Sequence, residues 1–495
     1  MQTPLLTDLY QLTMAQAAVR TGRAREHGVF QLFFRKLPFR GGYAVAAGLE
    51  SAFEWLQDLR FSAAELEYLA SLRGNDAGPL FDQAFLAQLR DLHLELAIDA
   101  VPEGSVVFAN EPLLRVTGVL WHAQLIETAL LNIINFQTLV ATKAARIVQA
   151  ARGRDVLEFG ARRAQGDAAL AASRAAYIGG CAATSLVAAG ERYGIPVRGT
   201  HAHSWVMAFD DELSAFDAYA TAAPNNCVLL VDTYDTLNGV RNAITIGERM
   251  RARGARLQGI RLDSGDLAWL SIEARKLLDA AGFTDTQIIA SNDLDEHLIE
   301  SLVQQDAAIS AWGVGTKLVT AYDEPALTGV YKLSMVRAGD DPSSAFVPRI
   351  KLSEQAAKVS TPGIQQIRRF RRGTRWVADV VYDLQLGCSD PCTMIDPFNP
   401  TRQRALDPSL EHDDLLVPVW RSGQRVSEAP PLTAARARVR EQLEQLDPTV
   451  RRLVHPHEYP VGLCAKLYEE RLQLIRAARA KSGGNRRPGG TPDTI

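Results

Sequence analysis

The chain has 495 residues, of which 47% are hydrophobic, so it can bury a large core spread over two or three domains. Its formal net charge of -3 excludes the overall basic footprint of a nucleic-acid or anionic-membrane binder, so any phosphate site must be local. The sequence carries neither a signal-peptide pattern nor an apolar run of membrane-spanning length, and we expect a cytoplasmic protein without a membrane partner.

Residues 1–130 predict a mixed α+β segment. Thr7 or Asp8 is placed to cap a first helix, whose apolar side chains recur between Leu12 and Ala18. A helical stretch from 49 to about 92, broken near 74–78, separates two groups of short strands. The strands are expected at residues 29–35, 43–47, 94–101, 105–108 and 113–116.

Residues 122–151 repeat apolar side chains at helical spacing without a proline, which predicts a long buried helix or a helix pair. Beyond them, short apolar runs alternate with helical patterns, which is typical of βα units and a parallel sheet. The runs begin near residues 156, 196, 227, 257, 287 and 307, and the helical patterns cover 168–193, 238–253, 267–281 and 295–305. Spacing alone does not decide closure, but about six consecutive units are compatible with a barrel.

A polar or reactive segment follows each of these apolar runs. The segments are residues 158–163, 200–204, 232–236, 261–266, 291–293 and 313–317. Because the carboxyl ends of parallel strands share one face, we expect all six segments to form one site. His201 and His203 follow a short extended run at 195–198, and on a strand both side chains would point the same way.

The residue types in these segments favour an anionic ligand. Arginines at two strand ends can fork onto a carboxylate or phosphate, and the glycines around Thr316 can expose backbone N–H groups to a phosphate. Asp263 and Asp266 suit ribose hydroxyls or Mg²⁺. Two simpler interpretations stay open: Asp266 caps the helix that begins at residue 267, and the arginines are structural ion-pair partners. A hydrolase with Asp263 and Glu158 as its carboxylate pair is a further alternative.

The five cysteines are scattered and odd in number, which is typical of free thiols in a reducing compartment. Cys388 and Cys392 form the single pair that hints at a metal, with His455 and His457 as distant candidate ligands. The spacing is loose and a second cysteine pair is missing, so a structural zinc is the less favoured interpretation.

Six motifs together resemble nicotinate phosphoribosyltransferases. They are TDLYQLTM at 7–14, FFRK at 33–36, EFGARRAQG at 158–166, GTHAHS at 199–204, RLDSGD at 261–266 and GVYKL at 329–333. They stand in the family's order, and the resemblance covers about residues 5–470. It implies a type II phosphoribosyltransferase that converts nicotinate and 5-phosphoribosyl 1-diphosphate into nicotinate mononucleotide and pyrophosphate, with Mg²⁺ and with ATP as co-substrate. A nicotinamide- or quinolinate-using relative and a catalytically silent binding homologue are the alternatives.

The resemblance also assigns roles to individual residues. Tyr10 and Phe159 would sandwich the pyridine ring, and Arg162, Thr200 and Arg261 would lie near its carboxylate or the phosphates. His203 matches the histidine that ATP phosphorylates, whereas His201 falls at a variable position of that motif. The remaining assignments are Asp263 facing the ribose, and Gly313, Gly315 and Thr316 in the loop that holds the 5-phosphate, with His203, Asp263 and Arg261 forming the catalytic set. Nothing in the sequence identifies the side chains that hold Mg²⁺.

The family fold implied by this resemblance is an irregular parallel α/β barrel with a second, mostly β domain built from both ends of the chain. Its active site lies across a homodimer. Strand patterns at 330–336, 346–352, 364–371 and 375–382 would join the N-terminal strands, followed by helices at 434–446 and 461–479. The expected units are 1–130 in the second domain, 131–330 as the barrel, 331–435 as an antiparallel segment that joins residues 1–130, 436–480 as C-terminal helices and 481–495 as a disordered tail.

Overall fold

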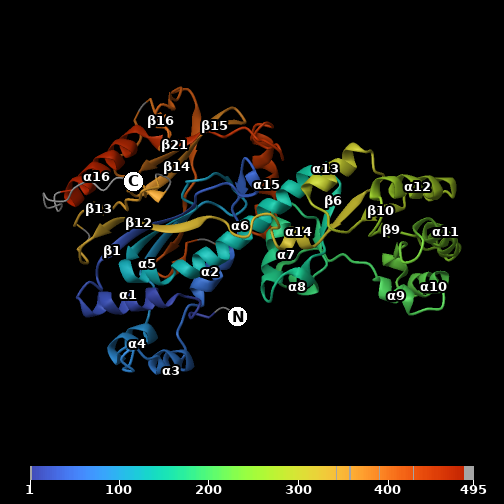
Figure 1. The fold of residues 1–495 in the computed structure, drawn as a ribbon, viewed down its shortest axis with the longest axis horizontal. Coiled ribbons are helices and arrows are strands. Elements are labelled where there is room, and N and C mark those ends of the chain that lie inside the picture. The colour runs from blue at the N-terminus through green and yellow to red at the C-terminus, as the bar shows by residue number, and fades with distance from the viewer. Residues whose placement is uncertain (1–2, 342, 356–357, 390, 427, 484–495) are drawn as a thin grey trace, which may run out of the picture.

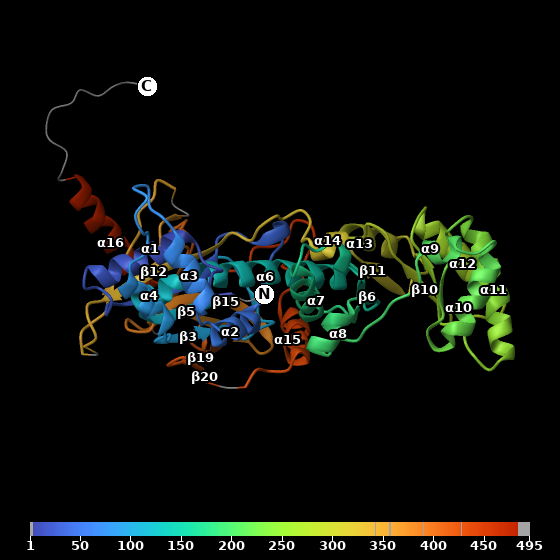
Figure 2. The same cartoon turned by 90° about the horizontal axis from the view of Figure 1, so that it is seen from below.

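The computed structural model describes residues 3–483, apart from 342, 356–357, 390 and 427. Two lobes lie at opposite ends of an elongated molecule, and helix α6 (Glu127–Ala150) runs from one toward the other (Figure 1, Figure 2). With α5 (Leu120–Leu125) before it, α6 confirms the predicted helix pair. No helix in the described ranges is long and apolar enough to cross a membrane.

The first lobe is built on a seven-stranded sheet in which every neighbouring pair is antiparallel. Its strands, in spatial order, are β13 (Val347–Pro348), β12 (Gly329–Arg337), β1 (His27–Phe34), β5 (Leu114–Val119), β3 (Leu96–Ala100), β19 (Val417–Arg421) and β20 (Gln424–Arg425). Strand β1 is an almost continuous apolar run, and the sheet buries it nearly throughout its length. A small pair of strands, β2 (Ala44–Val45) and β4 (Val106–Val107), lies beside this sheet.

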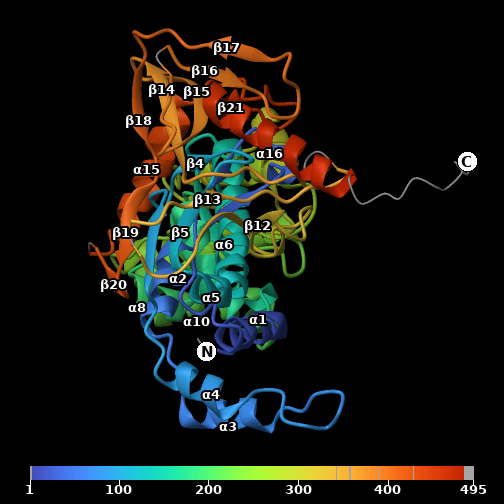
Figure 3. The same cartoon turned by 90° about the vertical axis from the view of Figure 1, so that its left-hand side faces the viewer.

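Short helices surround this lobe. They are α1 (Leu9–Arg20), η1 (Pro38–Arg40), α2 (Leu49–Gln57), α3 (Ala63–Ser71) and α4 (Gln83–Arg90). Asp8 caps α1 in a capping box with Gln11, as the sequence predicted for this position. The pair α3 and α4 projects away from both sheets (Figure 1, Figure 3).

A separate six-stranded sheet corrects the expectation for the C-terminal strands. Its order is β17 (Gln403–Ala405), β16 (Thr393–Ile395), β21 (Val461–Cys464), β15 (Arg375–Asp383), β14 (Gln365–Arg372) and β18 (Glu411–Asp414). Strands β14 and β15 therefore do not join the N-terminal strands; they form a local hairpin, and β19 is the strand that pairs with β3. This sheet stacks above the seven-stranded one, with α15 (Leu432–Gln445) and α16 (Ala465–Gly483) at its ends (Figure 3). The rest of the predicted tail, 484–495, lies outside the described residues.

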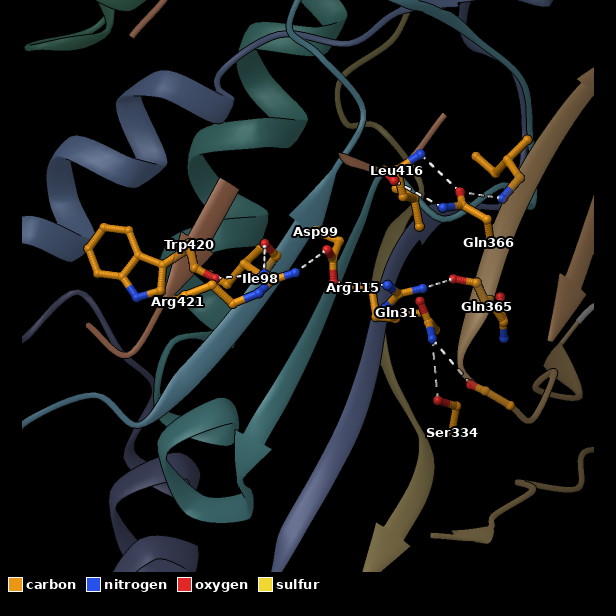
Figure 4. Close-up of polar contacts among 12 residues, drawn as sticks. Gln31, Ile98, Asp99, Arg115, Ser334, Gln365, Gln366, Leu416, Trp420 and Arg421 are labelled. Carbon is orange, nitrogen blue, oxygen red and sulfur yellow. Dashed lines mark hydrogen bonds and ion pairs between the residues drawn. The ribbon is translucent and has the colours of Figure 1, made fainter. Parts of the chain in front are cut away.

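Buried polar contacts join these two sheets (Figure 4). Arg115 donates to the main-chain oxygen of Gln365 at 2.6 Å and to Asp99 at 2.9 Å. Asp99 also accepts from Arg421 at 2.6 Å, so one carboxylate links three strands of the first sheet. Because an unpaired buried charge is costly, these contacts fix how the sheets are stacked.

The second lobe contains a six-stranded parallel sheet. Its order is β7 (Ala183–Thr184), β6 (Asp155–Glu158), β11 (Ala311–Val314), β10 (Gln287–Ala290), β9 (Gly259–Leu262) and β8 (Val228–Leu230). The helices of this lobe are η2 (Ala161–Arg163), α7 (Ala168–Ile178), α8 (Val187–Tyr193), α9 (His203–Met207), α10 (Glu212–Ala222), η3 (Pro224–Asn226), α11 (Thr236–Ala252), α12 (Leu267–Ala280), α13 (Glu296–Gln304) and α14 (Thr316–Val319). Five of the six predicted strand positions are confirmed, and the expected helix at 168–193 is interrupted by β7.

The segment 195–201 lies between the two edge strands, β7 and β8. It forms no regular strand at residue 196, contrary to the prediction, but Val197 makes a single parallel bridge to Thr184. On the other side, the Leu230 amide of β8 donates to Nε2 of His201 at 3.1 Å. At this point a side chain takes the place of a main-chain acceptor. Because the segment 195–201 connects the two edge strands in this irregular way, the sheet is an irregular barrel.

Buried ion pairs attach α6 to the parallel sheet domain. Glu296 of α13 accepts from Arg146 at 2.8 Å, and its second carboxylate oxygen lies 2.8 Å from Nζ of Lys143. All three side chains are almost completely buried. Because removing one partner would leave another charge unpaired in the interior, this cluster holds the two lobes in register.

Candidate active site

The carboxyl ends of the parallel strands bring the predicted segments together. Phe159 follows β6, Asp232 follows β8 and its neighbour Val231, Asp263 follows β9, Ser291 follows β10, and Gly315 follows β11. Hydrogen bonds link the segments after β8, β9 and β10, and nonbonded contacts link those after β6 and β11. The expectation of one shared face is therefore correct for these five strands.

His203 stands at the first position of α9 and faces two of these segments. Its Nδ1 lies 3.2 Å from the hydroxyl of Thr233, and its Nε2 lies 3.7 Å from Oδ2 of Asp263. The His203 and Asp263 side chains are 38% and 36% exposed, so the imidazole edge is open to a ligand. With Nδ1–H donating to Thr233, Nε2 carries a free lone pair.

Asp263 is held in place by its neighbours. Its amide donates to Asp232 at 2.8 Å, the Ser264 hydroxyl donates to the same Asp232 oxygen at 2.6 Å, and Ser291 donates to Oδ1 of Asp263. Oδ2 of Asp263 is then left to face His203. The sequence placed Asp232 and Ser291 in the polar segments but gave them no role, because their positions after neighbouring strands were their only signal.

Arg261 and Arg162 form a concentration of positive charge at the strand ends. Arg261 donates to the hydroxyl of Thr200, while its Nε is buried without a hydrogen-bond partner. Burial lowers the pKa of Arg261, and Arg162 lies close enough to lower it further, against the opposing effect of Asp263 and Asp232. Within the described residues neither guanidinium has a carboxylate within ion-pair distance, so the structural ion-pair interpretation has no support. The pair is suited to an anion supplied by a ligand.

Glycines allow an aromatic ring to lie against the strand ends. A Cβ added to Gly313 would come within 2.6 Å of Cδ2 of Phe159, so the ring lies directly against this glycine. Gly315 lies close to the main chain of Phe159 and precedes Thr316, the first residue of α14. A half-buried ring therefore stands beside the loop that was predicted to hold a phosphate.

Glu158 and Asp266 have structural roles. Glu158 is fully buried and accepts from the Gly160 amide and from the hydroxyls of Ser173 and Thr184, at 2.7 and 2.6 Å for the two hydroxyls. It cannot reach a substrate, which removes the hydrolase alternative. Asp266 accepts from the Trp269 amide at 3.1 Å and caps α12, as its simpler interpretation expected.

His201 does not share the environment of His203, and the prediction that both point the same way from a strand is wrong. The chain turns into α9 at His203, so the two side chains diverge. His201 is buried, accepts from the Leu230 amide and packs edge-on against Tyr219, with ring centroids 4.7 Å apart. Burial lowers the pKa of His201 to about 4.

This environment predicts a pH-dependent stability. Folded His201 stays neutral down to about pH 4, whereas the unfolded chain binds a proton near pH 6.5. The contribution of neutral His201 to the free energy of unfolding is therefore complete above about pH 6.5. It is lost as the pH falls toward 4, by about 3 kcal/mol in all. Denaturant unfolding between pH 7 and 4 should show a smaller loss for His201→Gln than for the unchanged protein. Equal losses would show that His201 is not held neutral.

Comparison with known proteins places this site in a family. Models of the nicotinate phosphoribosyltransferase N-terminal domain, family and C-terminal domain match residues 5–135, 155–358 and 365–471. The Bacillus subtilis nicotinate phosphoribosyltransferase is 43% identical over 483 residues, with 96% of each chain covered. The human nicotinate phosphoribosyltransferase is 34% identical over 544 residues, with 95% of this chain and 96% of the human protein covered. The chain belongs to the nicotinate phosphoribosyltransferase family.

Solved structures agree with this family assignment and with the fold class. The crystal structure of human nicotinic acid phosphoribosyltransferase superimposes with a TM-score of 0.82 at 32% identity, covering 94% of this chain and 99% of the human chain. A Pyrococcus furiosus nicotinate-nucleotide pyrophosphorylase shares the fold, with a TM-score of 0.66 at 22% identity. These matches confirm the family resemblance of the motifs and the parallel, barrel-like domain. They also confirm a second domain that is built from both ends of the chain.

One residue of the family motifs does not reach the site within a single chain. Tyr10 is 48% exposed on α1, in the lobe opposite the parallel sheet (Figure 1, Figure 2). It lies near Glu127, which in turn lies near Lys332 of β12. Phe159 and Tyr10 cannot sandwich a ring in one subunit.

The predicted cysteine pair is close in space but does not form part of a metal cluster in the described ranges. The sulfur atoms of Cys388 and Cys392 lie 2.8 Å apart. No group of three or more histidine, cysteine or acidic side chains among the described residues is arranged to hold a metal. Asp390, between the two cysteines, lies outside those residues.

Proposed function

We propose that this member of the family makes nicotinate mononucleotide and pyrophosphate from nicotinate and 5-phosphoribosyl 1-diphosphate, in NAD biosynthesis. The observation that carries the proposal is the Arg162 and Arg261 pair, which has no carboxylate partner among the described residues and stands at the strand ends, as does the half-buried ring of Phe159. A pyridine carboxylate matches both features, since its ring can stack and its charge can accept a guanidinium fork. The named activities of the relatives support the same reaction.

The remaining side chains fit the second substrate. Asp263 and its hydroxyl neighbours would orient the ribose, and Gly313, Gly315 and Thr316 would take the 5-phosphate through main-chain N–H groups. Asp263 and Asp232, which a hydrogen bond holds side by side, would be the carboxylates that hold Mg²⁺, and the ion would supply charge stabilisation for the leaving diphosphate. The chain's own part in catalysis is to position both substrates and stabilise the developing charge.

His203 would couple the reaction to ATP. Its Nε2 lone pair would attack the γ-phosphorus, forming an N–P bond as the bond to the ADP oxygen breaks. Thr233 would hold the opposite nitrogen as N–H, and Asp263 would later face the phosphohistidine. Hydrolysis of the N–P bond would return the free imidazole.

Substrate choice tests the proposed function. The segment 177–186 contains no acidic residue that could accept from a carboxamide, and the two arginines would pair with a carboxylate. Nicotinate should therefore be used about a hundredfold better than nicotinamide at equal concentration. The measurement is product analysis with both bases competing for 5-phosphoribosyl 1-diphosphate. Comparable amounts of the two nucleotides would contradict the proposal.

We also infer that the active unit is a homodimer, in which Tyr10 of one subunit covers Phe159 of the other. The two residues lie in opposite lobes of the elongated chain, and the exposed Tyr10 has no ring partner within its own lobe among the described residues. Lys332 and Tyr10 both lie near Glu127. Lys332 would therefore bring a cationic side chain to the same interface.

Mixing two inactive variants tests the shared site. Tyr10→Ala damages one half of the site and Arg261→Ala the other, so a mixed dimer carries one intact site. Unfolding and refolding the two variants together should restore nucleotide formation to about a quarter of the unchanged rate, because half of the randomly formed dimers are mixed. Each variant refolded alone is the control. If the mixture stays as inactive as the separate variants, both residues act within one subunit.

The five unpaired cysteines of the chain support a cytoplasmic, reducing location. Cell fractionation with an antibody against the chain would test this, and recovery in a secreted fraction would contradict it.

A further inference from the structure

A cavity of about 560 Å³ lies between the ends of α6 and α7 and the side of α15. Four arginines line it: Arg152, Arg436, Arg440 and Arg451. Its remaining wall is largely apolar and includes Val148, Val439 and Leu443. The volume falls in the range of ligand sites for small molecules.

This cavity is separate from the candidate active site. Gly153 on its rim precedes β6, so the cavity lies toward the amino ends of the parallel strands. The residues of the candidate active site follow the carboxyl ends of the same strands. None of the side chains proposed to bind a substrate or to react lines the cavity; of the segment 177–186, only its first residues, Tyr177, Gly179 and Gly180, do so.

In the part of the chain that the structure describes, the positive charge of the cavity is not neutralised. Glu444 is the one acidic residue of the lining, and none of the four arginines has an ion pair within the described part of the chain. The Nε atoms of Arg436 and Arg451 are buried without a hydrogen-bond partner, and so is Oε1 of Gln149. Arg436 and Arg451 are half-buried, whereas Arg152 and Arg440 are exposed. Partly desolvated positive charges without an anion are unfavourable, so an anionic ligand would stabilise this arrangement.

The Arg436 side chain and the main chain at Arg451 are already held in place. Arg436 donates to the main-chain oxygen of Gly180 at 3.0 Å, and its guanidinium lies 5.1 Å from the ring centre of Tyr177. The main-chain oxygen of Arg451 accepts from Gln149 at 2.7 Å, which ties its segment to α6. The Arg436 side chain would therefore lose little freedom when a ligand binds, which favours affinity.

We propose that this cavity binds a nucleotide, with the phosphate on the arginines and the base against the apolar wall. Several guanidinium groups around one space match the charge and the planar, bidentate geometry that phosphate accepts. The apolar lining requires more than a bare anion, because a free phosphate would leave that wall in contact with water. This site is independent of the proposed function.

Calorimetric titration of the full chain with adenosine 5′-monophosphate tests the proposal. Arg451→Gln should weaken binding of this nucleotide about tenfold or more, since a charge-assisted hydrogen bond is lost. Arg452→Gln is the matched control, because this neighbouring arginine is exposed and outside the cavity lining, and its affinity should not change. Arg440→Glu, on the exposed side of α15, repeats the test if Arg451→Gln lowers the melting temperature.

Three further arms decide between ligands and sites. Adenosine and inorganic phosphate, each alone, should bind at least tenfold more weakly than the nucleotide. Arg261→Ala, at the opposite end of the sheet, should leave the heat that comes from nucleotide binding in the cavity unchanged. The proposal is wrong if the two cavity variants bind like Arg452→Gln, if phosphate alone binds as well as the nucleotide, or if Arg261→Ala removes all binding.

Discussion

Replacing Arg261 with lysine is expected to lower kcat/KM for nicotinate by about a hundredfold. Lysine keeps the charge but offers a single ammonium in place of a planar fork, and it cannot both bind Thr200 and pair with a carboxylate in the same geometry. A lost charge-assisted hydrogen bond in a largely buried position is worth about 2–3 kcal/mol, which corresponds to this factor. Steady-state kinetics with varied nicotinate measure it.

The control for this substitution is Arg256→Lys. Arg256 is exposed in the segment before β9, away from the carboxyl ends of the strands, and the same change there should leave kcat/KM within a factor of two. If Arg261→Lys shows unchanged constants, the guanidinium fork does not touch the substrate. Loss of affinity for 5-phosphoribosyl 1-diphosphate alone would move the role of Arg261 from the carboxylate to a phosphate.

Replacing His203 with alanine is expected to abolish ATP hydrolysis and the ATP stimulation of nucleotide formation. The nucleophilic nitrogen disappears, while the arginine pair, Phe159 and the phosphate loop remain, so a slow ATP-independent transfer should persist. The measurement combines acid-labile label on the protein after incubation with γ-labelled ATP and nucleotide formation with and without ATP.

His201→Gln is the matched control for this second substitution. Its imidazole is buried against β8 rather than open to a ligand, and glutamine retains an acceptor for the Leu230 amide. This variant should keep both the label and the coupling. The assignment of His203 as the phosphorylated residue would be wrong if the His203→Ala protein carried as much label as the unchanged protein. It would also be wrong if only His201→Gln lost the label.

Long periodic segments predicted most of the fold, and short segments did not. Strand β1 and helix α6 carry patterns of eight and 24 residues, and both lie where the sequence placed them. Strands β7, β16 and β21 have two to four residues, too few for a period to emerge from the sequence. The separate C-terminal sheet was missed for this reason, because β14 and β15 alone could equally have extended the N-terminal sheet.

The candidate site was predictable where it depends on topology and not where it depends on loop geometry. Parallel strands bring their carboxyl ends together, so the segments that contain Asp263 and Ser291 were expected in one site, and the two side chains share a hydrogen bond there. The divergence of His201 from His203 depends on a turn into α9 that the residue types do not indicate. The place of Tyr10 depends on a second subunit, which one chain does not contain.

This member of the nicotinate phosphoribosyltransferase family is expected to transfer a phosphoribosyl group to nicotinate. The most direct test is to incubate the protein with labelled nicotinate, 5-phosphoribosyl 1-diphosphate, Mg²⁺ and ATP, and to separate the products by mass. We predict nicotinate mononucleotide and pyrophosphate in equal amounts. A chain that binds nicotinate but forms no nucleotide would be a silent homologue, and that result would contradict the account.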